Sequence, residues 1–198
     1  MPELRDIEGL FDGEELFVVG DYKPRKTIGS LDLKSQFVLG IDRAFYLYPA
    51  LTFWCSDNFA IDWPKYSTDI QRQVDLRIFT PRQSDRGDNF VHFTPYPLWA
   101  MPDEEVTRWR DGYKGNDCPI AIGGICLAVG LAFRLGFRRV VEVGTFPDGE
   151  HLRYDPETSN YTQKDWVDPK DVERTKYPLH RMIDLLGIEI SFHSKSLV

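Results

Sequence analysis

A helix that is apolar on nearly every side constrains this chain more than any other feature. It lies within residues 119–144, PIAIGGICLAVGLAFRLGFRRVVEVG, between a Gly-Gly pair and Gly136. Such a helix packs inside a domain rather than half in water. Gly136 stands where a helix end requires positive φ, and the following VVEV is typical of a parallel strand covered on both faces. The stretch therefore predicts half of a βαβ unit.

Short apolar runs separated by polar turns recur along the rest of the chain. They predict an α/β fold, a Rossmann-like, mostly parallel sheet with helices on both faces. With 198 residues, no internal repeat and no long linker, we expect one domain over residues 1–198. The expected strands lie at 16–20, 37–41, 51–57, 76–80, 90–94 and 188–193, and the expected helices at 42–49, 66–74, 103–110 and 172–186, the last interrupted at Pro178.

Charge and cysteine content restrict the binding partners and the cellular compartment that we expect for this protein. The 24 basic and 31 acidic residues give a net charge of −7, which argues against nucleic acid as a partner because its binding relies on phosphate neutralisation. No apolar run approaches the roughly 20 residues of a membrane span, and the acidic start is not a secretory signal. Three cysteines without C-x-x-C spacing indicate a reducing, cytoplasmic setting, with Cys55 and Cys126 in the core.

Glycines gather where the expected strands end and the central helix begins. Gly20 and Gly144 end strands, and Gly123 and Gly124 precede the helix. Glycine lets a backbone approach a ligand closely, and a helix N-terminus favours an anion. We expect these glycines, with Thr145, to shape a crevice for a nucleotide or nucleotide sugar. The alternative is that they serve only as turn residues.

Charged residues at the same edge supply candidate chemistry. Asp42 and Asp57 follow strands and could act as a base, hold a divalent metal or bind ribose hydroxyls, or they could cap helices. Arg43 could pair with a phosphate or with a nearby carboxylate. Lys23 could offset the charge of Asp21 beside a phosphate.

Residues 144–171 form a long polar stretch after the central strand, and they contain His151, a candidate general base. A loop of that length predicts a lid that closes over a ligand. The alternative is a rigid loop packed on the sheet edge or on a second subunit, which leaves a homo-oligomer open. The four histidines show no metal-binding spacing, so we expect no resident metal.

The order of these segments resembles one superfamily. It includes bacterial sialyltransferases, motility-associated flagellin-glycosylation proteins, archaeal 6-hydroxymethylpterin pyrophosphokinases and uncharacterised phage proteins, all with a Rossmann-like sheet. The resemblance covers residues 16–62 and 119–198. It rests on FVLGIDRAF at 37–45, FWCSD at 53–57, AFRLGFRRV at 132–140 and HRMIDLLGIEI at 180–190.

This resemblance implies a glycosyltransferase-like enzyme, related to sialyltransferases, that uses a nucleotide-activated donor and no cofactor. One alternative is a pyrophosphokinase whose Mg²⁺ is held by carboxylates such as Asp42 and Asp57. The other is a catalytically degenerate member that binds a nucleotide or a protein.

Several positions depart from the superfamily's pattern. Members carry Gly-x-Gly-Pro-Ser after the first strand, where this chain has GDYKPR at 20–25. They carry Asn where Asp42 stands and Ser-Gly where Gly123-Gly124 stands. The acceptor-activating His of the sialyltransferases has no counterpart in DVERTKYP at 171–178.

Overall fold

The computed structural model describes residues 2–22, 33, 36–48, 51–81, 87–112, 114–146, 152–155, 160–163 and 169–193. Strands and helices alternate along these ranges. In chain order they are η1 (Leu4–Ile7), β1 (Glu15–Val19), β2 (Phe37–Ile41), η2 (Ala44–Tyr46), β3 (Leu51–Cys55), α1 (Phe59–Gln73), β4 (Val74–Thr80), β5 (Phe90–His92), β6 (Thr94–Tyr96), η3 (Leu98–Ala100), α2 (Asp103–Asp111), β7 (Asp117–Pro119), α3 (Gly124–Leu135), β8 (Arg139–Val143), β9 (Leu152–Asp155), β10 (Asn160–Gln163), α4 (Pro169–Leu186) and β11 (Glu189–Phe192).

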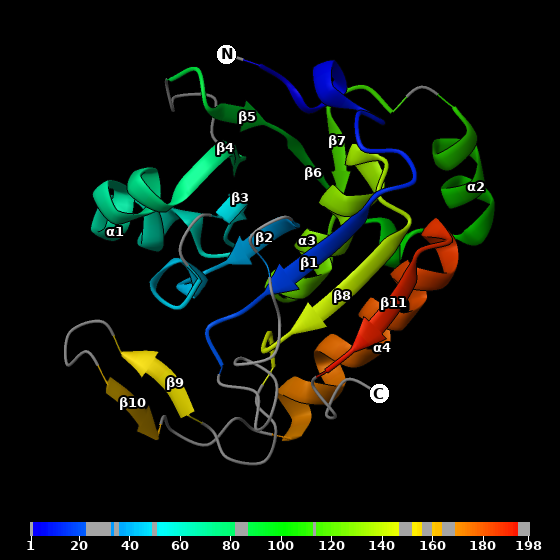
Figure 1. Cartoon of the computed structure of the whole chain (residues 1–198). Coiled ribbons are helices and arrows are strands. Elements are labelled where there is room, and N and C mark those ends of the chain that lie inside the picture. The colour runs from blue at the N-terminus through cyan, green and yellow to red at the C-terminus, as the bar shows by residue number, and fades with distance from the viewer. Residues whose placement is uncertain are drawn as a thin grey trace.

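Seven strands form the main sheet, in the order β11-β8-β1-β2-β3-β4-β5 (Figure 1). Every neighbouring pair in this sheet is parallel. Two small pairs stand apart from it, the parallel β6–β7 and the antiparallel β9–β10. The predicted α/β, Rossmann-like fold is therefore confirmed.

Side chains of β1 alternate between two cores, one on each face of the sheet. Leu16 and Val18 belong to the core that contains α3 and α4, whereas Val19 belongs to the core that contains α1. Successive side chains of a strand point to opposite faces of the sheet, which produces this division. Helices therefore cover both faces, as the sequence predicts.

Helix α3 is the central buried element. All twelve of its residues are buried, which confirms the prediction from its apolar circumference. Gly136 ends it in the left-handed conformation, with φ 99° and ψ −5°. A Cβ on Gly130 would overlap the carbonyl oxygen of Pro119, so the helix packs directly against β7 there.

Several predicted elements differ from those observed, and the helix expected at 42–49 is only the three-residue 3-10 helix η2. Helix α1 begins at Phe59 rather than at 66, and the expected strand at 90–94 is two strands, β5 and β6, divided at Phe93. Helix α4 begins at Pro169 and runs through Pro178 without a break. The stretch 144–171 is not without regular structure, because it contains β9 and β10. In Figure 1 this hairpin lies beyond the carboxyl ends of β1 and β8.

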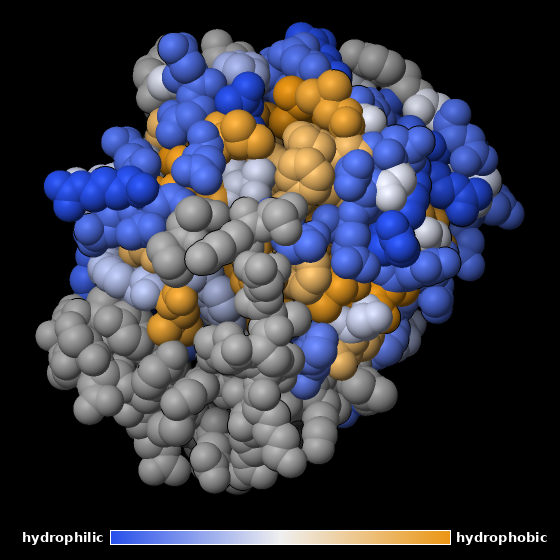
Figure 2. Space-filling view, in the orientation of Figure 1, coloured by the Kyte–Doolittle hydropathy of each residue, from blue (hydrophilic) through white to orange (hydrophobic). Residues whose placement is uncertain are grey.

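The N-terminal segment lies against the edge strand β5. His92 donates its backbone N–H to Pro2 O at 3.1 Å, and an isolated parallel bridge links Glu3 with His92. The face in Figure 2 is largely hydrophilic, with hydrophobic residues reaching the surface near η1. No helix among the described residues is both long and apolar enough to cross a membrane.

Candidate functional site

The order of the strands identifies one position in the sheet where ligands bind in folds of this kind. The chain adds strands outward from β1 to β5 and then crosses back to place β8 on the other side of β1. Between β1 and β8 the direction of winding reverses, and in open parallel sheets the ligand crevice lies beyond the carboxyl ends of such strands. Gly20 follows β1 and Gly144 follows β8, so both predicted glycines lie at this reversal.

Backbone contacts join the two loops at this point. Gly20 donates its N–H to Val143 O at 2.9 Å, and Tyr22 donates to Gly144 O at 3.0 Å. A Cβ on Gly20 would lie 2.7 Å from the Gly144 carbonyl carbon, too close for any other residue. Glycine is therefore required at position 20 by the contact between the loops, and the Gly20 N–H is already used in a hydrogen bond within the protein.

Arg43 and Asp21 form an ion pair beside this contact. Arg43 Nε lies 3.5 Å from Asp21 Oδ2, and the two side chains are 16% and 3% exposed. Asp21, which directly follows Gly20 in the loop after β1, thus holds Arg43 in an ion pair. The alternative in which Arg43 pairs with a carboxylate is the one observed, and its predicted contact with a phosphate stays a prediction.

Asp42 has an unusual backbone. It is the one described residue other than glycine with positive φ, at 50°. Its N–H donates to Cys55 O at 3.1 Å, and its carbonyl accepts from Trp54 Nε1 at 2.8 Å. A left-handed conformation carries a cost for any residue with a Cβ, and it persists where surrounding contacts fix it. These contacts from β3 fix the direction of the Asp42 side chain.

The Asp42 carboxylate lies at the start of α3. An ideal Cβ built on Gly124 would stand 3.6 Å from Asp42 Oδ2 and 3.3 Å from Ile41 Cδ1. Gly123 is the N-cap residue, with φ 94° and no side-chain cap hydrogen bond. A helix N-terminus carries partial positive charge, which attracts a carboxylate as it attracts a phosphate. Asp42, Gly123 and Gly124 are therefore brought together.

Two residues that sequence analysis missed, Ser56 and Asp62, are linked to Asp42 by hydrogen bonds. The Ser56 hydroxyl lies 3.0 Å from Asp42 Oδ1 and 2.6 Å from Asp62 Oδ2, and it accepts the Asn58 N–H at 3.0 Å. A hydroxyl has one hydrogen, so it donates to one carboxylate at a time. The arrangement is thus a short hydrogen-bonded chain in which one hydroxyl links two carboxylates.

The missed residues did leave a signal in the sequence. Ser56 directly follows an apolar strand, and Asp62 falls near the start of α1, the helix that packs beside that strand. Placing the helix start at residue 66 left Asp62 outside any element and hid this relation.

Asp57 lies close to the same region and is exposed, with Oδ1 accepting from Asn58 Nδ2 at 2.9 Å. Burial raises the pKa of the Cys55 thiol well above its ordinary value, and the nearby charges of Asp42, Cys118 and Asp57 raise it further. Burial and Asp57 also raise the pKa of Cys126, on the first turn of α3, to about 12. Asp42 and Asp57 therefore both act on Cys55. The thiols of Cys55 and Cys126 are buried core groups, as predicted.

Thr145 turns inward at the end of β8. Its N–H and its hydroxyl donate to Glu142 Oε1 at 2.8 and 2.7 Å, and His193 N–H donates to Glu142 Oε2 at 3.1 Å. Glu142 is fully buried. The carboxylate thus ties the loop of Gly144 and Thr145 to the end of β11, and sequence analysis missed this role.

Two predicted site residues, Lys23 and His151, lie outside the described residues. Within the described ranges, no group of three or more His, Cys, Asp or Glu side chains could hold a metal ion. Asp42 and Asp62 supply two carboxylates around Ser56. The described part of the site therefore holds a carboxylate, Asp42, at the N-terminus of α3.

Comparison with known proteins adds no family to this description. No family model matches the chain, and a search of curated proteins finds no significant match. The suspected superfamily therefore stays a prediction.

Proposed function

We propose that this chain is a glycosyltransferase-like enzyme of the sialyltransferase kind, with a nucleotide-activated sugar as donor. The observation that carries the proposal is Asp42. Its strained backbone directs a carboxylate to the N-terminus of α3, at the carboxyl edge of a doubly wound parallel sheet. Backbone strain of this kind gathers at functional sites.

In the proposed reaction, Asp42 is the general base. It accepts the proton of an acceptor hydroxyl as that oxygen bonds to the anomeric carbon of the donor. The bond between the sugar and the donor phosphate breaks, and the nucleotide leaves with its electron pair. The positive end of α3 faces the negative charge that forms on the leaving phosphate. Ser56, which Asp62 also contacts, orients the Asp42 carboxylate.

Specific observations favour each alternative to this proposal. For a pyrophosphokinase, Asp42 and Asp62 approach the same hydroxyl, and carboxylates paired in this way suit Mg²⁺. For a protein that binds without turnover, the Gly20 N–H that would contact a phosphate is bonded to Val143 O.

The test uses the full chain, a panel of nucleotides and nucleotide sugars, and the variants Asp42→Asn and Asp75→Asn. Asn retains an acceptor for Ser56 and tolerates positive φ but cannot act as a base. We expect Asp42→Asn to bind the donor within about threefold of the original chain by calorimetry. Its turnover should fall about 100-fold or more, the size of a general-base contribution. Asp75 is exposed on β4, so its variant is the control.

The alternatives give different results in the same experiment. Turnover abolished by EDTA and restored by Mg²⁺ would support the pyrophosphokinase. Tight donor binding with no turnover under any condition would support the binding protein. Equal turnover in Asp42→Asn and the original chain would remove Asp42 as the base. Absence of binding across the panel would contradict both enzymes and the nucleotide-binding alternative, and would leave only a protein-binding role.

A further inference from the structure

A separate pocket lies at the end of α3 opposite the candidate site. Its volume is about 300 Å³, and its lining includes Glu8, Asp12, Lys114, Phe133, Arg134 and Arg138. Because a helix rises 1.5 Å per residue, the twelve residues of α3 separate this pocket from Gly124 by roughly 17 Å. None of the candidate site residues lines it, so any ligand here would be a second one.

Two cations of the pocket are held by an aromatic ring. Lys114 Nζ lies 5.9 Å from the centroid of the Phe133 ring, and Arg138 Cζ lies 5.0 Å from it. Attraction between a cation and a ring face positions the charge without neutralising it. Within the described part of the chain, Arg138 has no ion pair and is exposed. Its charge is thus available to a ligand.

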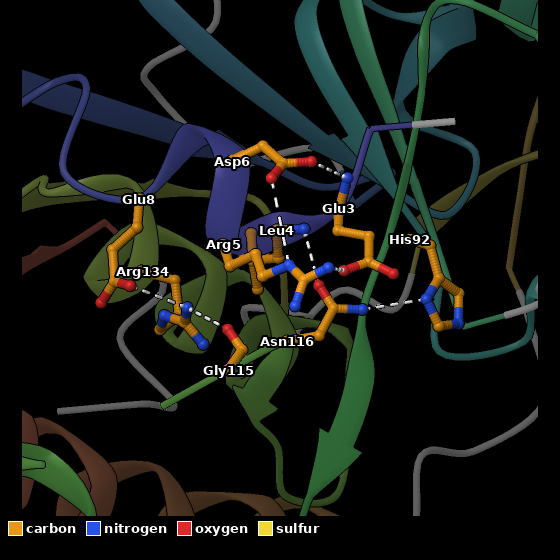
Figure 3. Close-up of polar contacts among 9 residues, drawn as sticks. All are labelled: Glu3, Leu4, Arg5, Asp6, Glu8, His92, Gly115, Asn116 and Arg134. Atoms are coloured by element: carbon orange, nitrogen blue, oxygen red, sulfur yellow. Dashed lines mark hydrogen bonds and ion pairs between the residues drawn. The ribbon is translucent and has the colours of Figure 1, made fainter. Parts of the chain in front are cut away.

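The third cation, Arg134, is fully buried and incompletely paired. Its Nη1 donates to Asp117 O. Its Nη2 donates to Gly115 O at 2.9 Å and to Glu8 Oε2 at 3.1 Å, the two contacts drawn in Figure 3. Its Nε has no hydrogen-bond partner in the described structure. A charged donor left unpaired in the interior is costly, and this donor belongs to a residue that lines the pocket.

A protein carboxylate already bridges two of these cations. Glu8 Oε2 lies 3.1 Å from Arg134 Nη2, and Glu8 Oε1 lies 3.7 Å from Lys114 Nζ. The Glu8 side chain is 40% exposed, whereas those of Lys114 and Arg134 are 16% and 0% exposed. The cations are therefore fixed, and the carboxylate between them sits at the surface, where another oxyanion can displace it.

We infer that this pocket binds a small oxyanion, a phosphate group in particular, between Lys114, Arg134 and Arg138. The three cations come from three elements, the segment before β7, the end of α3 and the residue before β8. A phosphate group carries more negative charge and more acceptor oxygens than a carboxylate, so it suits three cations better. The lining has one more basic than acidic side chain, although the chain as a whole carries −7.

The test is an NMR titration of the full chain with inorganic phosphate at constant ionic strength. Saturable shifts are expected at the amides of Gly9 and Gly136, which also line the pocket. Arg138→Ala should weaken phosphate about fivefold or more, as loss of one charge-assisted contact does. Arg139→Ala is the matched control, because Arg139 is an exposed neighbour outside the lining, and the affinity of this variant for phosphate should stay within about twofold of the original.

A second variant tests the competition with Glu8. Glu8→Gln retains an acceptor for Arg134 but removes the negative charge, so phosphate should bind about threefold or more tightly. Acetate should bind more weakly than phosphate in every variant. Three results would each overturn the inference. They are an equal loss of phosphate affinity in Arg138→Ala and Arg139→Ala, weaker phosphate binding in Glu8→Gln, and acetate binding as tight as that of phosphate. Shifts confined to Gly123 and Gly124 would also overturn it, by placing phosphate at the candidate site instead.

Discussion

At the scale of single residues, two glycines of the candidate site face different neighbours. A side chain on Gly20 would meet the backbone of Gly144 and Thr145, which cannot move without breaking the contact between the loops. A side chain on Gly124 would first meet Ile41 Cδ1 at 3.3 Å, the far end of a side chain that can rotate. Glycine is thus obligatory at the first position and replaceable at the second.

Gly20→Ala should therefore lower the free energy of unfolding by about 3 kcal/mol, the upper range for overpacking. Gly124→Ala should change it by less than about 1 kcal/mol, because the tight contact is offset by the helix propensity of alanine. Urea denaturation of both variants measures the difference. Similar values for the two would show that the loops of β1 and β8 can separate, and would restore a ligand-binding role to Gly20.

At the scale of elements, one amide side chain docks the N-terminal segment onto the sheet. Leu4 donates its N–H to Asn116 Oδ1 at 2.7 Å, and this bond sets which way the amide faces (Figure 3). Asn116 Nδ2 then points to His92 Nδ1 at 2.9 Å, so that ring nitrogen accepts and the proton of neutral His92 is on Nε2. Three segments distant in sequence meet at Asn116.

Replacing Asn116 tests this docking. Asn116→Ala should lower the free energy of unfolding by about 1–3 kcal/mol, since it leaves the Leu4 N–H and the buried His92 without partners. Hydrogen exchange at the Leu4 amide should accelerate more than exchange in α3. Asn89→Ala serves as the comparison, because no side-chain hydrogen bond of Asn89 is found in the described structure. A Leu4 amide that exchanges at the same rate in both variants would contradict the docking role.

The sequence predicted the elements whose pattern is local and missed those that depend on distant contacts. The apolar circumference of α3 and its terminal glycine are local signals, and both were read correctly. Pro178 removes one hydrogen bond from α4 and favours a break, but Thr175, Leu179 and Met182 are buried around it, and their packing holds the helix together. The three-residue strands β6 and β7 have too few residues for a pattern.

The candidate site divides in the same way. Asp42 and the glycines of α3 could be placed because they adjoin strong strand and helix patterns. Ser56, Asp62 and Glu142 could not, because their roles follow from distances between side chains of separate elements. The pairing of Arg43 with Asp21 likewise depends on how closely the loops after β1 and β2 approach.

At the scale of the whole molecule, three buried thiols make the free energy of unfolding depend on pH in the alkaline range. Burial raises the pKa of Cys55 and Cys118, and it raises that of Cys126 from 9.0 to about 12. At pH values between the unfolded and the folded pKa, the folded protein keeps its thiol protons while the unfolded chain loses them. The corresponding stability is complete below about pH 9 and is lost as pH rises toward the folded pKa.

Comparing the original chain with Cys126→Ala isolates one of these thiols. Between pH 8 and 10.5 the original chain should lose about 2 kcal/mol more of its unfolding free energy than the variant, at 1.36 kcal/mol per pH unit above the unfolded pKa. Tyrosines and lysines titrate in both proteins and cancel in the comparison. Stability curves that stay parallel over this range would show that Cys126 ionises freely in the folded state.

The central place of β1 in the sheet also governs the order in which the chain can fold. During synthesis β1 can pair with β2 early, but its other neighbour, residues 139–143, leaves the ribosome only after most of the chain has been made. Contacts of such high sequence separation form slowly because a long loop must first be closed. Until α3 and β8 have been made, the face of β1, β2 and β3 that α3 covers has no complete core, so the nascent chain exposes apolar surface and depends on rapid closure, or on a chaperone, to avoid aggregation.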